Sequence, residues 1–351
     1  MDLFAERLVR WHKRHGRHDL PWQQARDPYT VWLSEIMLQQ TQVSSVIPYF
    51  LRFIARFPDV AVLAAAAQDE VLAHWSGLGY YARGRNLHRA AQLIMERHGG
   101  VFPDDFDPVA ALPGIGRSTA AAILAFSFGQ KRAILDGNVK RVLARCFGIG
   151  GYPGAKPVEN ALWQKAEQLL PDADIETYTQ ALMDLGATVC TRARPKCASC
   201  PFNGNCVAYN ENRLAELPAS RPRKVLPHKE TVMLILLRQG EVFLEKRPAT
   251  GIWGGMWSFP EAAREDGLRD VCMSRFGFGV SALDPWPEFE HAFTHFRLNI
   301  LPRPLLVTAI QPQVRQPDGV WLHPLDALEA AIPTPVRRLL RQMGKDGGCY
   351  N

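Results

Sequence analysis

The periodicity of apolar residues changes once along this chain, and that change limits the folds it can adopt. Residues 28–147 repeat apolar side chains at spacings of three and four, as in "RNLHRAAQLIMERH", which is typical of amphipathic helices. Residues 231–248, "TVMLILLRQGEVFLEKRP", instead place two β-rich runs around Gln239-Gly240, a hairpin signal. We therefore expect a helical region followed by an α+β region.

Between these regions, residues 211–230 are rich in proline and charge, as linkers are. The length of 351 residues also favours two domains. Asp27 before Pro28 predicts a helix start, because aspartate caps free amides and proline fits the first turn. We place a helical domain at residues 1–210, a linker at 211–229 and an α+β domain at 230–345.

Composition limits the compartment and the class of partner. No segment is long and apolar enough to span a membrane, and "MDLFAERLVRWHKRHGRHDLPW" lacks the apolar core of a signal peptide. We expect a cytoplasmic protein whose thiols stay reduced. The net charge of +6 and a pI of about 9.0 favour a polyanionic partner such as nucleic acid, without proving one.

Four of the seven cysteines lie in "CTRARPKCASCPFNGNC", residues 190–206. In a reducing compartment such a group binds metal more often than it forms disulfides. Zinc ribbons usually show two separated C-x2-C pairs, whereas the spacing here is C-x6-C-x2-C-x5-C, which also suits the four thiolates of a 4Fe-4S cluster. The cysteine spacing alone does not decide between zinc and a 4Fe-4S cluster. The candidate ligands are Cys190, Cys197, Cys200 and Cys206, and we expect Cys146, Cys272 and Cys349 to be core or surface thiols.

The stretch "LPGIGRSTAAAILAFSFG" places Gly114 and Gly116 immediately before an expected helix. Its free amides can hold a backbone phosphate without reading sequence, although a glycine turn between packed helices is also ordinary architecture. Asp136 follows in "ILDGNVKRVLARCF", just ahead of another helix start. Because the positive end of a helix stabilises a carboxylate, we expect Asp136 to remain ionised.

Together, the glycine turn, the following aspartate and the cysteine spacing resemble the DNA glycosylase superfamily that includes endonuclease III. Within it, "SEIMLQQTQV", "GLGYYARGRNL", "LPGIGRSTA" and "LDGNVKRV" closely resemble MutY-type adenine DNA glycosylases, and the resemblance covers nearly the whole chain. It implies an all-α helix-hairpin-helix fold with a 4Fe-4S loop at residues 190–206, followed by a Nudix-like domain. It also implies a monomer that removes adenine opposite 8-oxoguanine or guanine in double-stranded DNA.

The resemblance assigns catalytic roles to two carboxylates. Glu35 lies in "YTVWLSEIMLQQ", where apolar neighbours would raise its pKa, although spacing alone fits a solvated helix glutamate better. By resemblance, Glu35 protonates the leaving adenine and Asp136 stabilises the cationic sugar, a pairing of one protonated and one ionised carboxylate. Asn138 would support them by hydrogen bonding.

Bifunctional relatives carry a lysine after the hairpin that attacks the sugar, and this chain has Ser118 at that position. A serine cannot form the imine, so we expect a monofunctional glycosylase. Gln40 and Tyr80 match the family positions that wedge into the duplex, although Tyr80 alone also fits a core aromatic. The predicted DNA contacts are Gln40, Thr41, Leu78, Tyr80, Gly114, Gly116, Ser118 and Lys140.

In the second domain, "HAFTHFRL" resembles the family's Phe-Ser-His loop that senses 8-oxoguanine, here Phe293, Thr294 and His295. "GGMWSFPEAAREDGLRDVCMSRFG" has no cluster of glutamates able to hold magnesium, so we expect recognition without Nudix hydrolysis. Two alternatives remain: an endonuclease III-like bifunctional lyase, and a non-catalytic DNA-binding protein that senses redox state.

Overall fold

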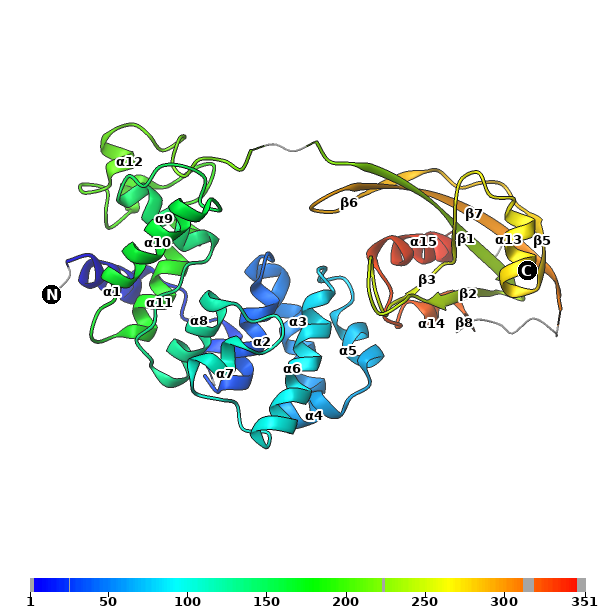
Figure 1. Ribbon diagram of the computed structural model, residues 1–351, viewed down its shortest axis with the longest axis horizontal. Coiled ribbons are helices and arrows are strands. Elements are labelled where there is room, and N and C mark those ends of the chain that lie inside the picture. Colours follow the sequence, from blue (N-terminus) through cyan, green and yellow to red (C-terminus); the bar gives the residue numbers. More distant parts are fainter. Residues whose placement is uncertain (1–2, 25, 223–224, 312–318, 346–351) are drawn as a thin grey trace. The chain divides into compact units, whose positions relative to one another are not determined.

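The computed structural model describes residues 3–24, 26–222, 225–311 and 319–345 (Figure 1). The chain divides into two compact units. The first comprises Met1–Ala65 and Asn86–Arg223, and the second comprises Ala66–Arg85 and Lys224–Asn351. None of the helices in the described ranges is long and apolar enough to cross a membrane. Cys349 lies outside these ranges.

The first unit is helical, and its key helices begin where local signals predict. The Asp27 side chain accepts hydrogen bonds from the first amides of α2 (Pro28–Leu38), and Asp136 caps α9 (Gly137–Cys146) in the same way. Gly116 precedes α8 (Arg117–Phe128). The remaining helices are α1 (Leu3–His15), η1 (Pro21–Gln23), α3 (Val43–Arg56), α4 (Val60–Ala65), α7 (Phe106–Ala110), α10 (Lys156–Gln168), α11 (Ile175–Asp184), η2 (Leu185–Val189), η3 (Cys197–Ser199) and α12 (Val207–Asn210), with most of α6 (Ala82–His98).

Packing of these helices brings distant parts of the sequence together. α2 packs on α3 and α8, and α11 packs on α1, α8 and α9. One apolar core joins α1, α8, α9 and α11 to the cysteine segment, where the Phe4 ring stacks on Phe202 at 4.2 Å between centroids. The end of α2, the start of α9 and residues 190–206 are therefore held on one framework.

The second unit contains a mixed sheet, which confirms the α+β expectation. Its main strand order is β3-β2-β1-β7-β5, with β1 parallel to β7 and the other pairs antiparallel. Gln239 and Gly240 both have positive φ, 50° and 78°, as a tight β1–β2 hairpin requires. The elements are β1 (His228–Arg238), β2 (Glu241–Lys246), β3 (Trp257–Ser258), β4 (Glu261–Ala262), α13 (Leu268–Phe276), β5 (Phe278–Ala282), β6 (Phe289–Ala292), β7 (Arg297–Ile310), β8 (Gly319–Leu322), α14 (Pro324–Ala327) and α15 (Thr334–Lys345).

Residues 66–85, which include α5 (Gln68–Trp75), belong to the second unit. The Ser76 hydroxyl donates to the carbonyl of Ile332 at 2.7 Å and accepts from Arg337 at 2.9 Å. Arg85 donates to the carbonyl of Gly254 at 2.9 Å. The helical periodicity of this segment gave no sign of the association.

Candidate active site

A cavity of about 210 Å³ lies in the helical unit, and Glu35 forms part of its wall. Apolar side chains of η1, α2 and α3 line it, and polar groups from the start of the chain and from α11 face the same space. Such a mixture of apolar walls and a few polar groups is typical of small-molecule sites. The apolar lining includes Leu20, Trp22, Val31, Leu38 and Val43, and the polar lining includes His18, Gln23, Glu35 and Gln180.

The surroundings of the Glu35 carboxyl group favour its protonated form. It projects from α2 between the buried residues Ser34 and Ile36, and only part of the side chain is accessible, through the cavity. Loss of hydration, and then the negative charge of Asp136, raise the pKa of Glu35 to about 8. The expected direction of this pKa is therefore confirmed, and Glu35 is largely protonated at neutral pH.

Asp136 differs from the sequence expectation in one respect. Its carboxylate accepts hydrogen bonds from the Val139 amide at 2.7 Å and from Asn138 Nδ2 at 3.2 Å. Burial nevertheless raises the pKa of Asp136, and these hydrogen bonds and the charge of Arg141 only oppose that rise. Burial, which the sequence did not reveal, therefore decides the direction of this pKa shift against the helix end, and the ionised state of Asp136 stays a prediction.

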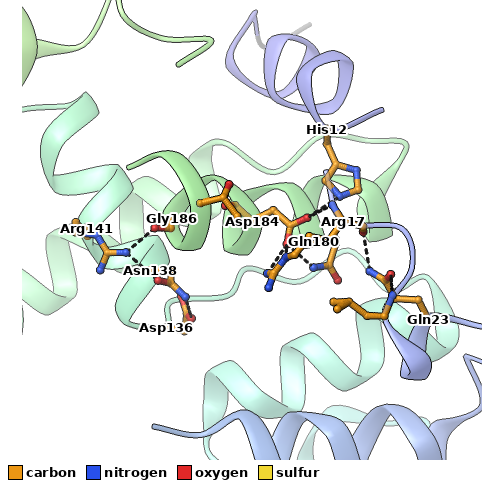
Figure 2. A network of polar contacts seen from close by, with 11 residues as sticks. His12, Arg17, Gln23, Asp136, Asn138, Arg141, Gln180, Asp184 and Gly186 are labelled. Carbon is orange, nitrogen blue, oxygen red and sulfur yellow. Dashed lines mark hydrogen bonds and ion pairs between the residues drawn. The ribbon is translucent and has the colours of Figure 1, made fainter. Parts of the chain in front are cut away.

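Arg141 contacts Asn138, the partner of Asp136, and also Gly186 (Figure 2). Its guanidinium donates to Asn138 Oδ1 at 2.8 Å, to the Gly186 carbonyl at 2.7 Å and to the Cys190 carbonyl at 2.7 Å. A Cβ on Gly186 would stand 2.5 Å from the Cβ of Asn138, so glycine is needed for this approach. Sequence analysis did not identify Arg141 or Gly186, since no local motif marks their contacts.

A second polar network lies beside the cavity, centred on the fully buried Asp184 (Figure 2). Arg17 donates to its carboxylate from the backbone amide at 2.7 Å and from Nε at 2.9 Å. Gln180 Nε2 donates at 2.8 Å, and His12 Nε2 lies 3.2 Å away. Burial acts to raise the pKa of Asp184, but the contacts with His12 and Arg17 outweigh it and hold that pKa below its ordinary value. The hydrogen bond to Asp184 holds the Gln180 side chain at the cavity wall.

The glycine hairpin is built as expected. Gly114 has a φ of +82°, and Gly116 is the N-cap of α8. Gln39, at the end of α2, donates to the Gly114 carbonyl at 3.2 Å. Ser118 Oγ accepts from the Leu135 amide at 2.9 Å, so the residue in the lysine's position has a structural contact of its own.

Two predicted wedge residues are presented to solvent on strained turns. Gln40 is exposed with a φ of +56°, and Thr41 follows it. Tyr80 is 44% exposed with a φ of +49°, which excludes the core alternative for this residue. Trp75 Nε1 and Arg83 Nη2 both donate to the carbonyl of Gly79, at 3.2 and 3.1 Å, and hold the turn before Tyr80.

Two other predicted DNA contacts, Leu78 and Lys140, are less accessible than Tyr80. Leu78 is only 7% exposed, because its amide closes a turn onto the Trp75 carbonyl and the apolar side chain points inward. Lys140 Nζ lies 2.7 Å from Glu159 Oε1, so its charge is paired, and the contact lowers the pKa of Glu159. Neither side chain is presented as a free surface group in this structure.

The four clustered cysteines line one small cavity together with Cys146. Arg145, which is only 3% exposed, places Nη1 3.5 Å from Cys190 Sγ and donates to the Thr191 carbonyl at 2.7 Å. A hydrogen bond from Cys146 is the largest cause lowering the pKa of Cys206 to about 6. Within the described ranges, no group of three or more His, Cys, Asp or Glu side chains is placed so that it could hold a metal ion. The position of Cys146 here was not anticipated.

In the second unit, the predicted lesion-sensing residues form the tip of the β6–β7 hairpin. The Phe293 amide donates to the Phe296 carbonyl at 2.9 Å and closes a tight turn. Thr294 and His295 are exposed at the tip, with Thr294 Oγ1 3.4 Å from His295 Nδ1. The hydroxyl and the imidazole are thus presented side by side to solvent.

Comparison with known proteins identifies the family. Residues 33–168 match the HhH-GPD superfamily of base excision DNA repair proteins, and residues 231–342 match the NUDIX domain. A protein of Buchnera aphidicola named adenine DNA glycosylase is 37% identical over 346 residues, covering 98% of each chain. The chain belongs to the adenine DNA glycosylase family. The human adenine DNA glycosylase is 33% identical to this glycosylase, covering 96% of its chain and 73% of the human one.

The fold agrees with that assignment. The solved structure of a thermostable thymine-DNA glycosylase matches this adenine DNA glycosylase with a TM-score of 0.53 and 28% identity, covering 60% of this chain and 96% of that one. The protein therefore combines a helical glycosylase fold with a Nudix domain, as expected. It is a base excision repair enzyme that removes adenine from DNA by breaking the N-glycosyl bond.

Proposed function

We propose that this glycosylase acts on adenine opposite 8-oxoguanine or guanine in double-stranded DNA, without cleaving the strand. The observation that carries the proposal is a base-sized cavity whose wall holds Glu35, with a pKa near 8, coupled to the charge of Asp136. An adenine turned out of the helix would enter this cavity between Leu20, Trp22 and Leu38.

The chemistry follows from the two carboxyl groups. Protonated Glu35 donates its proton to N7 of adenine while the C1′–N9 bond breaks and its electron pair leaves with the base. The Asp136 carboxylate faces the positive charge that develops on the sugar and stabilises it. Water then attacks C1′, and the Glu35 carboxylate accepts the proton that the water releases.

Asn138 and Arg141 hold Asp136 in position for this step. Asn138 donates to the Asp136 carboxylate with its amide nitrogen and accepts from Arg141 with its amide oxygen. Without either residue, the Asp136 carboxylate would still accept from the Val139 amide, but the orientation of its second oxygen would be less well fixed. We assign both residues a positioning role.

Monofunctional action is proposed because Ser118 replaces the attacking lysine of the bifunctional relatives. The Ser118 hydroxyl accepts a hydrogen bond from the Leu135 amide, and a serine cannot form a Schiff base with the sugar. Lys140, the lysine that follows Asp136 in the sequence, forms an ion pair with Glu159. Hydrolysis that leaves an abasic site is therefore favoured.

We propose a 4Fe-4S cluster as the cofactor, held by Cys190, Cys197, Cys200 and Cys206. Support comes from the four thiols that line one cavity and from the buried positive charge of Arg145 beside Cys190, which suits a cluster of net negative charge. A cluster is wider than one zinc ion, so its thiolates stand farther apart than the ligands of a single metal. The cluster would give its loop a fixed shape that presents Arg192, Arg194 and Lys196 to DNA.

Binding of the duplex is assigned to both units. The glycine hairpin and Ser118 would hold a backbone phosphate, and Thr41 would contact DNA beside Gln40. Gln40 in the first unit and Tyr80 in the second would each wedge into the duplex. The tip of Phe293, Thr294 and His295 would read 8-oxoguanine. We further propose a monomer that works on DNA in the cytoplasm. Along the sequence we propose domain limits at 1–210, 211–229 and 230–345, with residues 66–85 packing with the second unit.

Single-turnover assays on three duplexes test the proposal. Adenine should be released from adenine opposite 8-oxoguanine faster than from adenine opposite guanine, and borohydride should trap no covalent complex with either. A duplex with an oxidised pyrimidine is the control and should stay intact. Efficient trapping and strand cleavage would instead assign the protein to the bifunctional lyases, and DNA binding without adenine release would favour the redox-sensing alternative.

A further inference from the structure

Trp253 occupies a strained backbone position in the second unit. Its φ is +53°, in the left-handed region where bulky side chains are rarely found. It lies in "GIWGGMW" between Gly251 and Gly255, both of which have positive φ without such strain. Strained backbone at a bulky residue points to a constraint on that side chain. The Trp253 side chain is almost fully buried.

The ring of Trp253 is clamped between two parts of the unit. On one side the Arg247 guanidinium lies 5.6 Å from the ring, and Arg247 Nε donates to the Ile252 carbonyl at 2.8 Å. Arg247 is also paired with Glu261. Toward the β6–β7 hairpin, the ring lies 5.7 Å from that of His291 and 5.5 Å from that of Phe293. The contacts of the Trp253 ring therefore reach Phe293, the first residue of the hairpin tip.

The aromatic contacts continue through the tip itself. The His291 and Phe293 rings meet edge to face at 4.8 Å, and Phe293 stacks on Phe296 at 4.3 Å. His295 packs edge-on against Phe296 at 4.8 Å. Phe293 is thus held from two directions, and the exposed Thr294 is attached directly to it.

We propose that Trp253 is a positioning residue for lesion recognition, which sets the orientation of the Phe293–Thr294–His295 tip without touching the damaged base. The inference rests on the proposed function, in which this tip reads 8-oxoguanine. A hydroxyl at the end of a four-residue turn discriminates between two bases only if the turn is rigid, because a mobile donor fits both. Trp253 supplies that rigidity through Phe293 and His291.

Selectivity is the quantity to measure, as the ratio of single-turnover rates for adenine opposite 8-oxoguanine and opposite guanine at one salt concentration. Trp253→Leu should lower this ratio about tenfold, the effect of losing roughly one well-placed hydrogen bond. Trp253→Tyr keeps an aromatic ring and should retain most of the ratio. Trp321→Leu is the matched control, because Trp321 packs on Phe243 and Phe278 away from the tip, and it should leave the ratio unchanged.

A spectroscopic readout separates positioning from a general loss of fold. In protein labelled with 5-fluorotryptophan, the Trp253 fluorine resonance is assigned by its absence in Trp253→Tyr. It should shift when a duplex with 8-oxoguanine opposite a non-cleavable adenine analogue binds, and Thr294→Ala should reduce that shift. The inference is overturned if the resonance stays in place, or if Trp253→Leu slows both substrates equally.

Variants of the tip distinguish this inference from the proposed function. If Phe293→Ala and Thr294→Ala leave the selectivity ratio unchanged, the tip does not read the lesion. The part of the proposed function that assigns 8-oxoguanine recognition to this tip is then wrong. If both lower the ratio while Trp253→Leu does not, the tip reads the lesion without help from Trp253, and only the further inference fails.

Discussion

Ser118 Oγ accepts a hydrogen bond from the backbone amide of Leu135, one residue before Asp136. This hydrogen bond joins Ser118 to the backbone just before Asp136, the carboxylate for which we propose a catalytic role. Ser118→Ala leaves the buried Leu135 amide without its acceptor, and we expect a loss of about 1–3 kcal/mol in unfolding free energy. Adenine excision should slow with it, whereas Ser118→Thr, which keeps the hydroxyl, should change little. Chemical denaturation measures this, and equal stability of Ser118→Ala and the parent protein would show that the bond is dispensable.

Substitution of Gly186 tests whether Asn138 must hold the Asp136 carboxylate in place. A methyl group on Gly186 would approach the Cβ of Asn138 to 2.5 Å, so Gly186→Ala must displace Asn138 or the turn that carries Gly186. We expect at least a tenfold slower single-turnover excision, about 1.4 kcal/mol in the barrier, with DNA affinity nearly unchanged. Gly150→Ala is the control, since an added Cβ there meets nothing within 4 Å. An excision rate in Gly186→Ala equal to that of the control would remove the proposed role of the contact.

The cysteine segment predicts a difference between two neighbouring thiols. Cys197→Ala removes a proposed cluster ligand and should abolish the broad visible absorption and the iron content of freshly purified protein. Cys146→Ala changes a thiol that lines the same cavity but is not a proposed ligand, and it should keep both. DNA binding should weaken in the first variant. Stoichiometric zinc without iron in the parent protein would refute the cluster.

Asp184 predicts a pH dependence of stability. Its pKa is held below the ordinary value in the folded state, so its stabilising effect is fully present above the unfolded pKa of about 3.9 and is lost as pH falls through the lower folded value. Asp184→Asn should cost about 3 kcal/mol at neutral pH, because Arg17 loses its buried partner. The difference between the melting temperatures of the two proteins should be constant near neutral pH and should begin to shrink as pH falls below about 4. A difference that stays constant with pH would contradict this account.

Features marked by local signals were predictable from the sequence. The Asp27 cap, the glycines of the hairpin, the Gln239-Gly240 turn and the exposed Tyr80 each depend on a few adjacent residues. The family resemblance supplied the pairing of Glu35 and Asp136, and the apolar neighbours of Glu35 indicated the direction of its pKa.

Features that depend on long-range packing were not predictable. The buried Asp184 takes two of its partners, His12 and Arg17, from more than 160 positions away in the sequence, and Arg141 donates to the Cys190 carbonyl. The net rise in the pKa of Asp136 comes from burial by neighbouring helices, and the association of residues 66–85 with the second unit comes from single side-chain contacts. None of these contacts leaves a periodic pattern.

If Glu35 holds the proton that adenine receives, the pH dependence of single-turnover excision should follow the ionisation of Glu35. With a pKa near 8, Glu35 is protonated at neutral pH, so the rate should fall about tenfold per pH unit above about pH 8. Glu35→Gln, which binds the duplex but donates no acidic proton, should be at least about 100-fold slower at every pH. A rate that stays constant up to about pH 10, or a Glu35→Gln variant close to the parent rate, would contradict the account.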